Sequence, residues 1–183
     1  MKSYVAWLRG INVSGQKLIK MDHLKMIFES LQLSSVTTYI QSGNVLFLSD
    51  DLDTEALTLR IEKGLYEALG YEVPVIIRTV EELESVIANN PYDLNAFTEK
   101  DKLYVTFLSK KPSPEAVEAL MAFQNEIDEF HIQDREVYIL VHSSYGKTLF
   151  SNNFIEKKLR VSGTTRNWAT INKMISLHRN RKG

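Results

Sequence analysis

The amino-acid sequence predicts an α+β protein built from two subdomains, and three observations lead to this prediction. Over residues 1–91, short apolar runs alternate with helical patterns in the order β-α-β-β-α-β, the ferredoxin-like arrangement. A polar stretch follows at residues 92–102. The run YVTFL at 104–108 then echoes YVAWL at 4–8, which suggests an internal duplication and a second, related unit over residues 101–183.

The first half of the first subdomain is predicted from hydrophobic periodicity. Residues 4–8 form an apolar run rich in aromatic and β-branched residues, typical of a buried strand. Apolar residues recur at helical spacing over 21–31 and predict an amphipathic helix. Strands are predicted at 36–40 and 45–48, because the four residues between them, Gln41 to Asn44, suit a hairpin turn.

The second half is delimited by capping signals. A helix follows the capping candidates Asp53 and Thr54 and ends at Gly70. A strand is predicted at 73–78. Thr79 and Glu82 then form a capping box for a short helix that stops before Pro91. These elements complete the ferredoxin-like order.

The second subdomain is predicted as a β-α-β-β-α unit with an extra C-terminal helix. Its first strand, at 104–108, is followed by a helix that opens at Ser113 with a proline at its first position. The remaining elements are two strands at 129–132 and 137–142 and two helices at about 152–159 and 167–177.

Composition excludes several classes of protein. The 183 residues are 44% hydrophobic and 25% charged, as in an ordinary folded protein. No apolar run is long enough to span a bilayer and the N-terminus lacks a signal-peptide core, so we expect a cytoplasmic protein without a membrane partner. The absence of cysteine excludes disulfides and thiolate chemistry. The four histidines show no metal-ligand spacing, so neither a metal nor a cofactor is expected.

Positive charge is concentrated at the C-terminus. Residues 1–155 contain 14 Lys/Arg and 22 Asp/Glu, whereas residues 156–183 contain 8 Lys/Arg and one Glu. A basic segment of this kind can bind nucleic acid or another polyanion, or it can simply be a solvated helix face. Because no apolar residue follows Leu177, we expect residues 179–183 to be peripheral to the fold.

Four motifs carry a resemblance to a known family. They are LRGINV at 8–13, TYIQSGNV at 38–45, YVTFL at 104–108 and TTRNW at 164–168. In this order and spacing the chain resembles, from Tyr4 to Leu177, the bacterial domain-of-unknown-function family 1697; one departure is Ser14-Gly15, where a double glycine is expected. The resemblance implies two α+β subdomains. It implies no activity, so no catalytic residue is carried over.

Two of these motifs are predicted to meet at one sheet edge. In a ferredoxin-like sheet the first strand lies antiparallel to the third, so residues 9–12 should lie beside residues 41–44. Together they offer a guanidinium, amides and a hydroxyl, which suit a phosphate, a carboxylate or a nucleotide edge. The structural alternative is that Gly43 and Asn44 only form the hairpin and that Arg9 pairs with an acid.

A third motif precedes the last predicted helix. Arg166 stands at the helix N-terminus, where free N–H groups and the helix dipole favour an anion. The alternative is that Thr165 or Asn167 caps the helix and that Trp168 belongs to its core stripe.

We therefore expect a binding module for an anionic ligand, either nucleic acid or a phosphorylated metabolite. The alternative is an enzyme acting on a small phosphorylated or carboxylated substrate in a cleft between the subdomains. No catalytic residue is identified. The predicted ligand-binding residues, expected to form one exposed surface, are Arg9, Asn12, Gln41, Ser42, Asn44 and Arg166, with Asn167 and Trp168 beside it.

Overall fold

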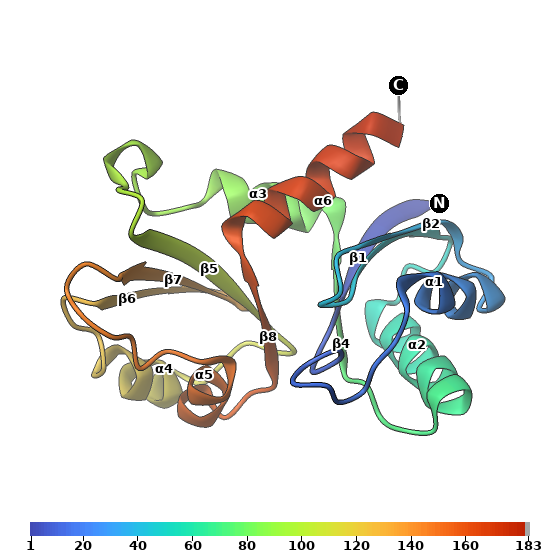
Figure 1. Ribbon diagram of the computed structural model, residues 1–183, viewed down its shortest axis with the longest axis horizontal. Coiled ribbons are helices and arrows are strands. Elements are labelled where there is room, and N and C mark those ends of the chain that lie inside the picture. The colour runs from blue at the N-terminus through green and yellow to red at the C-terminus, as the bar shows by residue number, and fades with distance from the viewer. Residues whose placement is uncertain (182–183) are drawn as a thin grey trace. The chain divides into compact units, whose positions relative to one another are not determined.

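The computed structural model describes residues 1–181, and the chain divides into two compact units (Figure 1). Unit 1 comprises residues 1–85 together with the segment from Lys173 onward, and unit 2 comprises residues 86–172. Each unit contains a four-stranded antiparallel sheet. The predicted α+β class and the ferredoxin-like first half are confirmed. The predicted bounds, 1–91 and 101–183, stay a prediction, because two helices each belong partly to both units.

Unit 1 has the predicted order of elements. Its sheet runs β2-β3-β1-β4, so the first strand lies between the third and the fourth. The elements are β1 (Lys2–Leu8), α1 (Met21–Ser30), β2 (Ser34–Tyr39), β3 (Asn44–Ser49), α2 (Thr54–Leu69), β4 (Val75–Thr79) and the first part of α3 (Val80–Ala88).

The helix boundaries in unit 1 follow the capping residues. The Asp53 carboxylate accepts hydrogen bonds from the N–H groups of Glu55 and Ala56, and Gly70 ends α2 in the left-handed conformation. Thr79 and Glu82 form the predicted capping box: Thr79 N–H donates to Glu82 (2.7 Å) and Glu82 N–H donates to Thr79 Oγ1 (3.1 Å).

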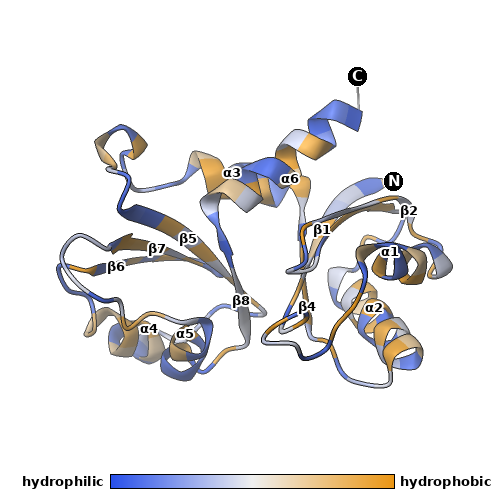
Figure 2. Ribbon diagram, in the orientation of Figure 1, coloured by the Kyte–Doolittle hydropathy of each residue, from blue (hydrophilic) through white to orange (hydrophobic). Residues whose placement is uncertain are grey.

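The core of unit 1 lies between the sheet and helices α1 and α2. Tyr4, Ala6 and Leu8 face this core from β1, while the alternate residues Val5 and Trp7 are also fully buried. In Figure 2, α1 and α2 carry hydrophobic and hydrophilic stripes, the amphipathic pattern of helices that lie on a sheet. Because β1 is buried on both faces, its end is a rigid support for the loop that follows.

Unit 2 repeats the same arrangement, with sheet order β6-β7-β5-β8. Its elements are η1 (Leu94–Ala96), β5 (Asp101–Leu108), α4 (Pro114–Met121), β6 (Asp128–Gln133), β7 (Glu136–His142), α5 (Asn152–Leu159), β8 (Gly163–Asn167) and the first part of α6 (Trp168–Arg181).

One element of unit 2 differs from the sequence-based expectation. No strand was predicted before the last helix, but residues 163–167 form the strand β8, which pairs antiparallel with β5. Two β-branched residues, Thr164 and Thr165, favour the extended backbone. Gly163 lies so close to Thr106 and Leu108 that an added Cβ would be 2.9 Å from Thr106 Cγ2. Unit 2 is therefore a complete β-α-β-β-α-β unit.

The two units share their hydrogen-bond register, which supports the suggested internal duplication. Leu8 N–H donates to Gly43 O (2.9 Å), and Leu108 N–H donates to Arg135 O (2.8 Å) at the equivalent place. Arg78 of β4 lies opposite Val5, as Arg166 of β8 lies opposite Val105. At these positions the two sheets hold the same residues: Leu8 and Leu108, Val5 and Val105, and Arg78 and Arg166.

The expectation of a peripheral basic tail is wrong for Arg181. Helix α6 continues to Arg181, whose Nη2 hydrogen-bonds Thr37 Oγ1 and Leu46 O in unit 1. His178 is buried, whereas Arg179 makes only an exposed ion pair with Glu84 (3.6 Å). A side chain that reaches polar groups of the sheet anchors the helix end without an apolar residue. Lys182 and Gly183 lie outside the described residues.

We therefore expect Arg181→Ala to lower the free energy of unfolding by about 1–2 kcal/mol, because two hydrogen bonds from a charged donor are lost. Arg179→Ala is the matched control, and its exposed pair is worth less than about 1 kcal/mol. Urea denaturation of the two variants measures the difference. Equal stability of both variants and the wild type would contradict the docked tail.

Candidate functional site

The end of β1 and the start of β3 meet at one edge of the unit 1 sheet. Trp7 pairs with Asn44, and Leu8 N–H donates to Gly43 O (2.9 Å). The loops that continue these strands, residues 9–20 and 40–43, are therefore neighbours, as predicted from the strand order. We call these two loops together the unit 1 rim.

Asn12 braces the unit 1 rim. Its Oδ1 accepts from Ile19 N–H (2.8 Å), and its Nδ2 donates to Ile19 O (3.1 Å) and to Gln41 O (2.7 Å). Its own N–H donates to Lys17 O (3.1 Å). One side chain thus closes the longer loop on itself and ties it to the shorter loop.

Gly43 brings the two loops into close contact. It has a φ of +85°, and an added Cβ would lie 2.6 Å from Ile11 Cδ1 and 2.9 Å from Leu8 Cβ. Only glycine satisfies both the left-handed backbone and this close approach. The shape of the unit 1 rim is therefore set by packing as well as by hydrogen bonds.

The unit 1 rim has a basic and polar character. Arg9, Lys17 and Lys20 lie in residues 9–20, and neither loop contains an Asp or Glu. Gln41 and Ser42 are exposed beside them. The Lys17 ammonium donates to the main-chain carbonyl of Glu72 (3.1 Å) and lies 5.6 Å from the Tyr71 ring centroid. The two loops therefore carry positive charge and hydrogen-bond donors but no carboxylate.

Asn12 and Asn44 differ in role from the sequence-based expectation. Asn44 is fully buried, and its Nδ2 donates to Tyr39 O (2.8 Å) and Ser42 Oγ (3.0 Å). The expected exposure is therefore wrong for Asn44, which forms the hairpin as the alternative interpretation held. Asn12 likewise uses its amide to support the loops. Arg9, Gln41 and Ser42 have some exposure at the surface.

Arg166, Asn167 and Trp168 belong to unit 2, so they are described apart from the other five residues. Arg166 is buried, and its Nη1 donates to Thr164 Oγ1 (2.8 Å) and Thr165 O (2.9 Å). Burial lowers the pKa of Arg166 to about 10. Asn167 Oδ1 accepts from Thr170 N–H (2.8 Å) and caps α6. The expected exposure of Arg166 is wrong, because the β-strand turns this side chain inward.

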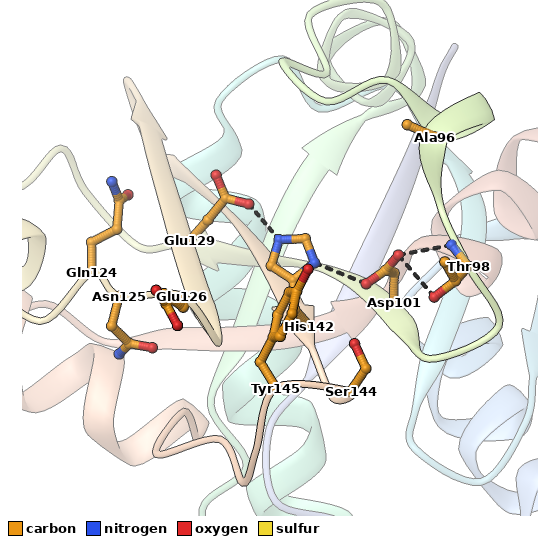
Figure 3. Close-up of a pocket in the computed structure, with 10 residues that line it drawn as sticks. All are labelled: Ala96, Thr98, Asp101, Gln124, Asn125, Glu126, Glu129, His142, Ser144 and Tyr145. Carbon is orange, nitrogen blue, oxygen red and sulfur yellow. Dashed lines mark hydrogen bonds and ion pairs between the residues drawn. The ribbon is translucent and has the colours of Figure 1, made fainter.

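Sequence reasoning missed a second cluster, which lies in a pocket of about 820 Å³ in unit 2 (Figure 3). His142 Nδ1 lies 2.8 Å from Asp101 Oδ1, and His142 Nε2 lies 2.5 Å from Glu129 Oε2. Thr98 N–H donates to Asp101 (2.7 Å), and Tyr145 makes an edge contact with the imidazole. The spacing of these residues along the chain gives no metal-ligand signal. The pairing of β5 with β7 brings them together, because it places Asp101 opposite His142.

The pocket holds one imidazole among several carboxylates. The hydrogen bond to Glu129 and, after it, that to Asp101 raise the pKa of His142, against the opposing effect of burial. The pKa of Asp101 is lowered, first by the hydrogen bond from Thr98 N–H and then by that from His142. Glu126 adds a further acid to the lining. In residues 1–181, no group of three His, Asp or Glu side chains is arranged to hold a metal ion.

The protein thus belongs to the class of α+β proteins with two ferredoxin-like units in one chain, and the first unit carries a basic rim. Residues 1–138 match the family model described as a protein of unknown function, DUF1697, and the chain belongs to this family. A search of curated proteins finds no match. In the described part of the chain, no helix is long and apolar enough to cross a membrane.

A solved structure shows the same fold. It is that of the conserved bacterial protein SP0830 from Streptococcus pneumoniae, which is 22% identical in sequence, with a TM-score of 0.75. The match covers 97% of this chain and 98% of that protein. At this identity the likeness concerns the fold and not the function.

Proposed function

We propose that the protein binds an anionic, phosphate-bearing ligand, a nucleic acid or a phosphorylated metabolite, at the unit 1 rim. The supporting observation is that the Asn12 side chain holds two neighbouring loops together. Neither of these loops contains an Asp or a Glu. A site that is ordered before the ligand arrives loses less conformational entropy on binding. The brace therefore favours a ligand-binding role for the unit 1 rim over the role of a solvated basic loop.

The chemistry of the unit 1 rim suits phosphate oxygens. Arg9 offers a planar guanidinium for two parallel hydrogen bonds, and Lys17 and Lys20 add point charges. Gln41 and Ser42 supply neutral donors next to them. Such a site binds through charge, so its affinity falls as salt rises.

The alternative function, an enzyme acting on a phosphorylated or carboxylated substrate in a cleft between the units, stays a prediction. The His142 pocket lies within unit 2 and does not favour that substrate class. Its lining includes Asp101, Glu126 and Glu129, whose negative charges repel a phosphate or a carboxylate.

Fluorescence anisotropy with a labelled single-stranded oligonucleotide tests the proposal, with inorganic pyrophosphate as a competitor. We expect Arg9→Ala to weaken binding by about tenfold, because a charge-assisted hydrogen bond contributes about 1.5–3 kcal/mol. Lys17→Ala should weaken it less, since Lys17 is a single point charge. Lys2→Ala is the control, because Lys2 begins the strand that ends just before Arg9 and lies about 20 Å away along it.

The pyrophosphate arm separates the two kinds of ligand. Displacement of the oligonucleotide by pyrophosphate at comparable concentrations of phosphate groups indicates a small phosphorylated ligand, whereas resistance to displacement indicates a nucleic acid. Equal affinities of the Arg9, Lys17 and Lys2 variants would exclude the unit 1 rim as the binding site.

A further inference from the structure

His142 joins three neighbouring strands on one face of the unit 2 sheet. It is the last residue of β7, and it lies directly opposite Asp101, the first residue of β5. Glu129 of β6 lies opposite Leu140, two residues before His142, so its side chain reaches the imidazole diagonally across the same face. The two carboxylates therefore flank the ring from opposite sides (Figure 3).

Both nitrogens of His142 face acceptors. An ionised carboxylate only accepts hydrogen bonds, and a neutral imidazole has a single N–H to donate. Two hydrogen bonds, at 2.8 Å to Asp101 and 2.5 Å to Glu129, thus require the imidazolium form. When the ring loses a proton, one nitrogen presents a lone pair to a carboxylate, and that contact becomes repulsive.

Glu129 is the partner that is released. The Asp101 carboxylate is fixed by Thr98, whose N–H and hydroxyl both donate to Oδ2, and its side chain is only 8% exposed. The Glu129 side chain is 41% exposed and can turn toward water. Deprotonation should therefore leave the Asp101 bond to Nδ1 in place and break the bond to Nε2.

The other groups around the ring do not replace this partner. Tyr145, from the loop after β7, contacts the ring by its edge, and Glu126 lines the pocket from the turn before β6. The pKa of Tyr92 is raised by burial and then by the charge of Glu129, so its phenol stays neutral and supplies no positive charge to the released carboxylate. No Lys or Arg is among the residues that line this pocket in the described chain.

β6 is well placed to respond. It is an edge strand with β7 as its neighbour in the sheet. At its start, Asp128 accepts from Thr148 Oγ1 (2.5 Å) and Leu149 N–H (3.2 Å), which holds the loop after β7. Loosening this end of β6 therefore loosens a loop that carries Tyr145 and Ser144, two residues of the pocket wall.

We propose that His142 is a proton-operated clasp of unit 2. The protonated ring holds β6 through Glu129, and loss of the proton releases Glu129 and lets the start of β6 and the following pocket wall open more often. The clasp goes beyond the proposed ligand binding, since its residues belong to another unit and to none of the loops of the unit 1 rim.

The sign of the pH dependence follows from the two pKa shifts. The raised pKa of His142 gives stabilisation that is present below the ordinary histidine pKa, about 6.5, and is lost as pH rises through the folded-state pKa. The lowered pKa of Asp101 gives stabilisation that is present above the ordinary carboxyl pKa, about 4, and is lost as pH falls through the folded-state pKa. The clasp is therefore strongest between about pH 4 and 6.5.

Two NMR measurements on the full chain test the clasp. Ring C–H signals of the histidines are followed from pH 5 to 9, and amide hydrogen exchange is measured along β6 above and below the midpoint of His142. His131 lies exposed on the same strand. Glu129→Gln is the test variant, since it keeps the shape and removes the charge; His131→Gln is the matched control.

We expect His142 to titrate above the ordinary histidine pKa of about 6.5, and Glu129→Gln to lower the midpoint of His142. In the wild type, protection of the amides at 129–131 against hydrogen exchange should fall by about three- to tenfold above that midpoint, compared with the amides of β7. This range corresponds to the loss of one half-exposed, charge-assisted hydrogen bond. The Glu129 variant should show protection that does not change across the midpoint, because the glutamine amide can accept from the protonated ring and donate to the neutral one. His131→Gln should behave as the wild type.

Three results would overturn the clasp. They are a His142 midpoint at or below the ordinary histidine pKa of about 6.5, a His142 midpoint that Glu129→Gln leaves in place, and wild-type β6 protection that does not change across the midpoint.

Discussion

Arg166→Ala is expected to lower the free energy of unfolding by about 2–4 kcal/mol, the range for truncating a buried side chain and losing its hydrogen bonds. Arg166 is buried in β8 and donates to Thr164 and Thr165, so its removal leaves a cavity and unsatisfied acceptors. Affinity for an anionic ligand at the unit 1 rim should stay unchanged. Urea denaturation and the oligonucleotide assay measure the two quantities.

Arg166→Met separates packing from charge. Methionine keeps much of the apolar stem but has no charge, and replacing a buried ionic group by an apolar one of similar volume is often neutral or stabilising. We expect this variant to recover more than half of the stability lost in Arg166→Ala. Full stability of Arg166→Ala with weakened ligand binding would contradict the buried role and restore the exposed anion site predicted from the sequence.

Gly43→Ala is expected to cost about 2–4 kcal/mol, because it combines a left-handed backbone with a close contact. The φ of +85° costs about 1 kcal/mol for alanine, and the new Cβ meets Ile11 and Leu8 at 2.6 and 2.9 Å, an overpacking that adds about 1–3 kcal/mol. Since Ile11 lies within the unit 1 rim, ligand affinity should fall as well.

Gly70→Ala is the matched control for this change. Gly70 has a φ of +80° and nothing within 4 Å of an added Cβ, so it carries the backbone penalty alone. Thermal and urea unfolding of both variants should show the larger loss at Gly43. Equal losses at the two glycines would mean that the close contact with Ile11 has no energetic weight.

The elements that sequence reasoning identified well are those with a local signal. The cap at Asp53, the capping box at Thr79 and the end of α2 at Gly70 each depend on residues a few positions apart, and each is confirmed. The proximity of the unit 1 loops was also predictable, because one assumption about strand order fixes which loop ends meet.

The parts that were missed depend on which way a side chain faces. Arg166 was expected at an exposed helix N-terminus, yet the two threonines before it extend the backbone into β8 and turn the guanidinium inward. Arg181 was expected to be peripheral because no apolar residue follows Leu177, yet it is held by polar groups of β2 and β3. His142 and Asp101 are 41 residues apart and meet only through the pairing of β5 with β7.

The most direct test of ligand binding at the unit 1 rim is an amide and side-chain NMR titration of the full chain with the single-stranded oligonucleotide, repeated at two salt concentrations. Binding at the unit 1 rim predicts that the largest shifts fall on residues 9–20 and 40–43 and that they weaken at the higher salt. It also predicts that Arg9→Ala needs about tenfold more oligonucleotide to reach the same shifts, whereas Lys2→Ala does not. Shifts that centre elsewhere in the chain, or that persist unchanged in Arg9→Ala, would contradict it.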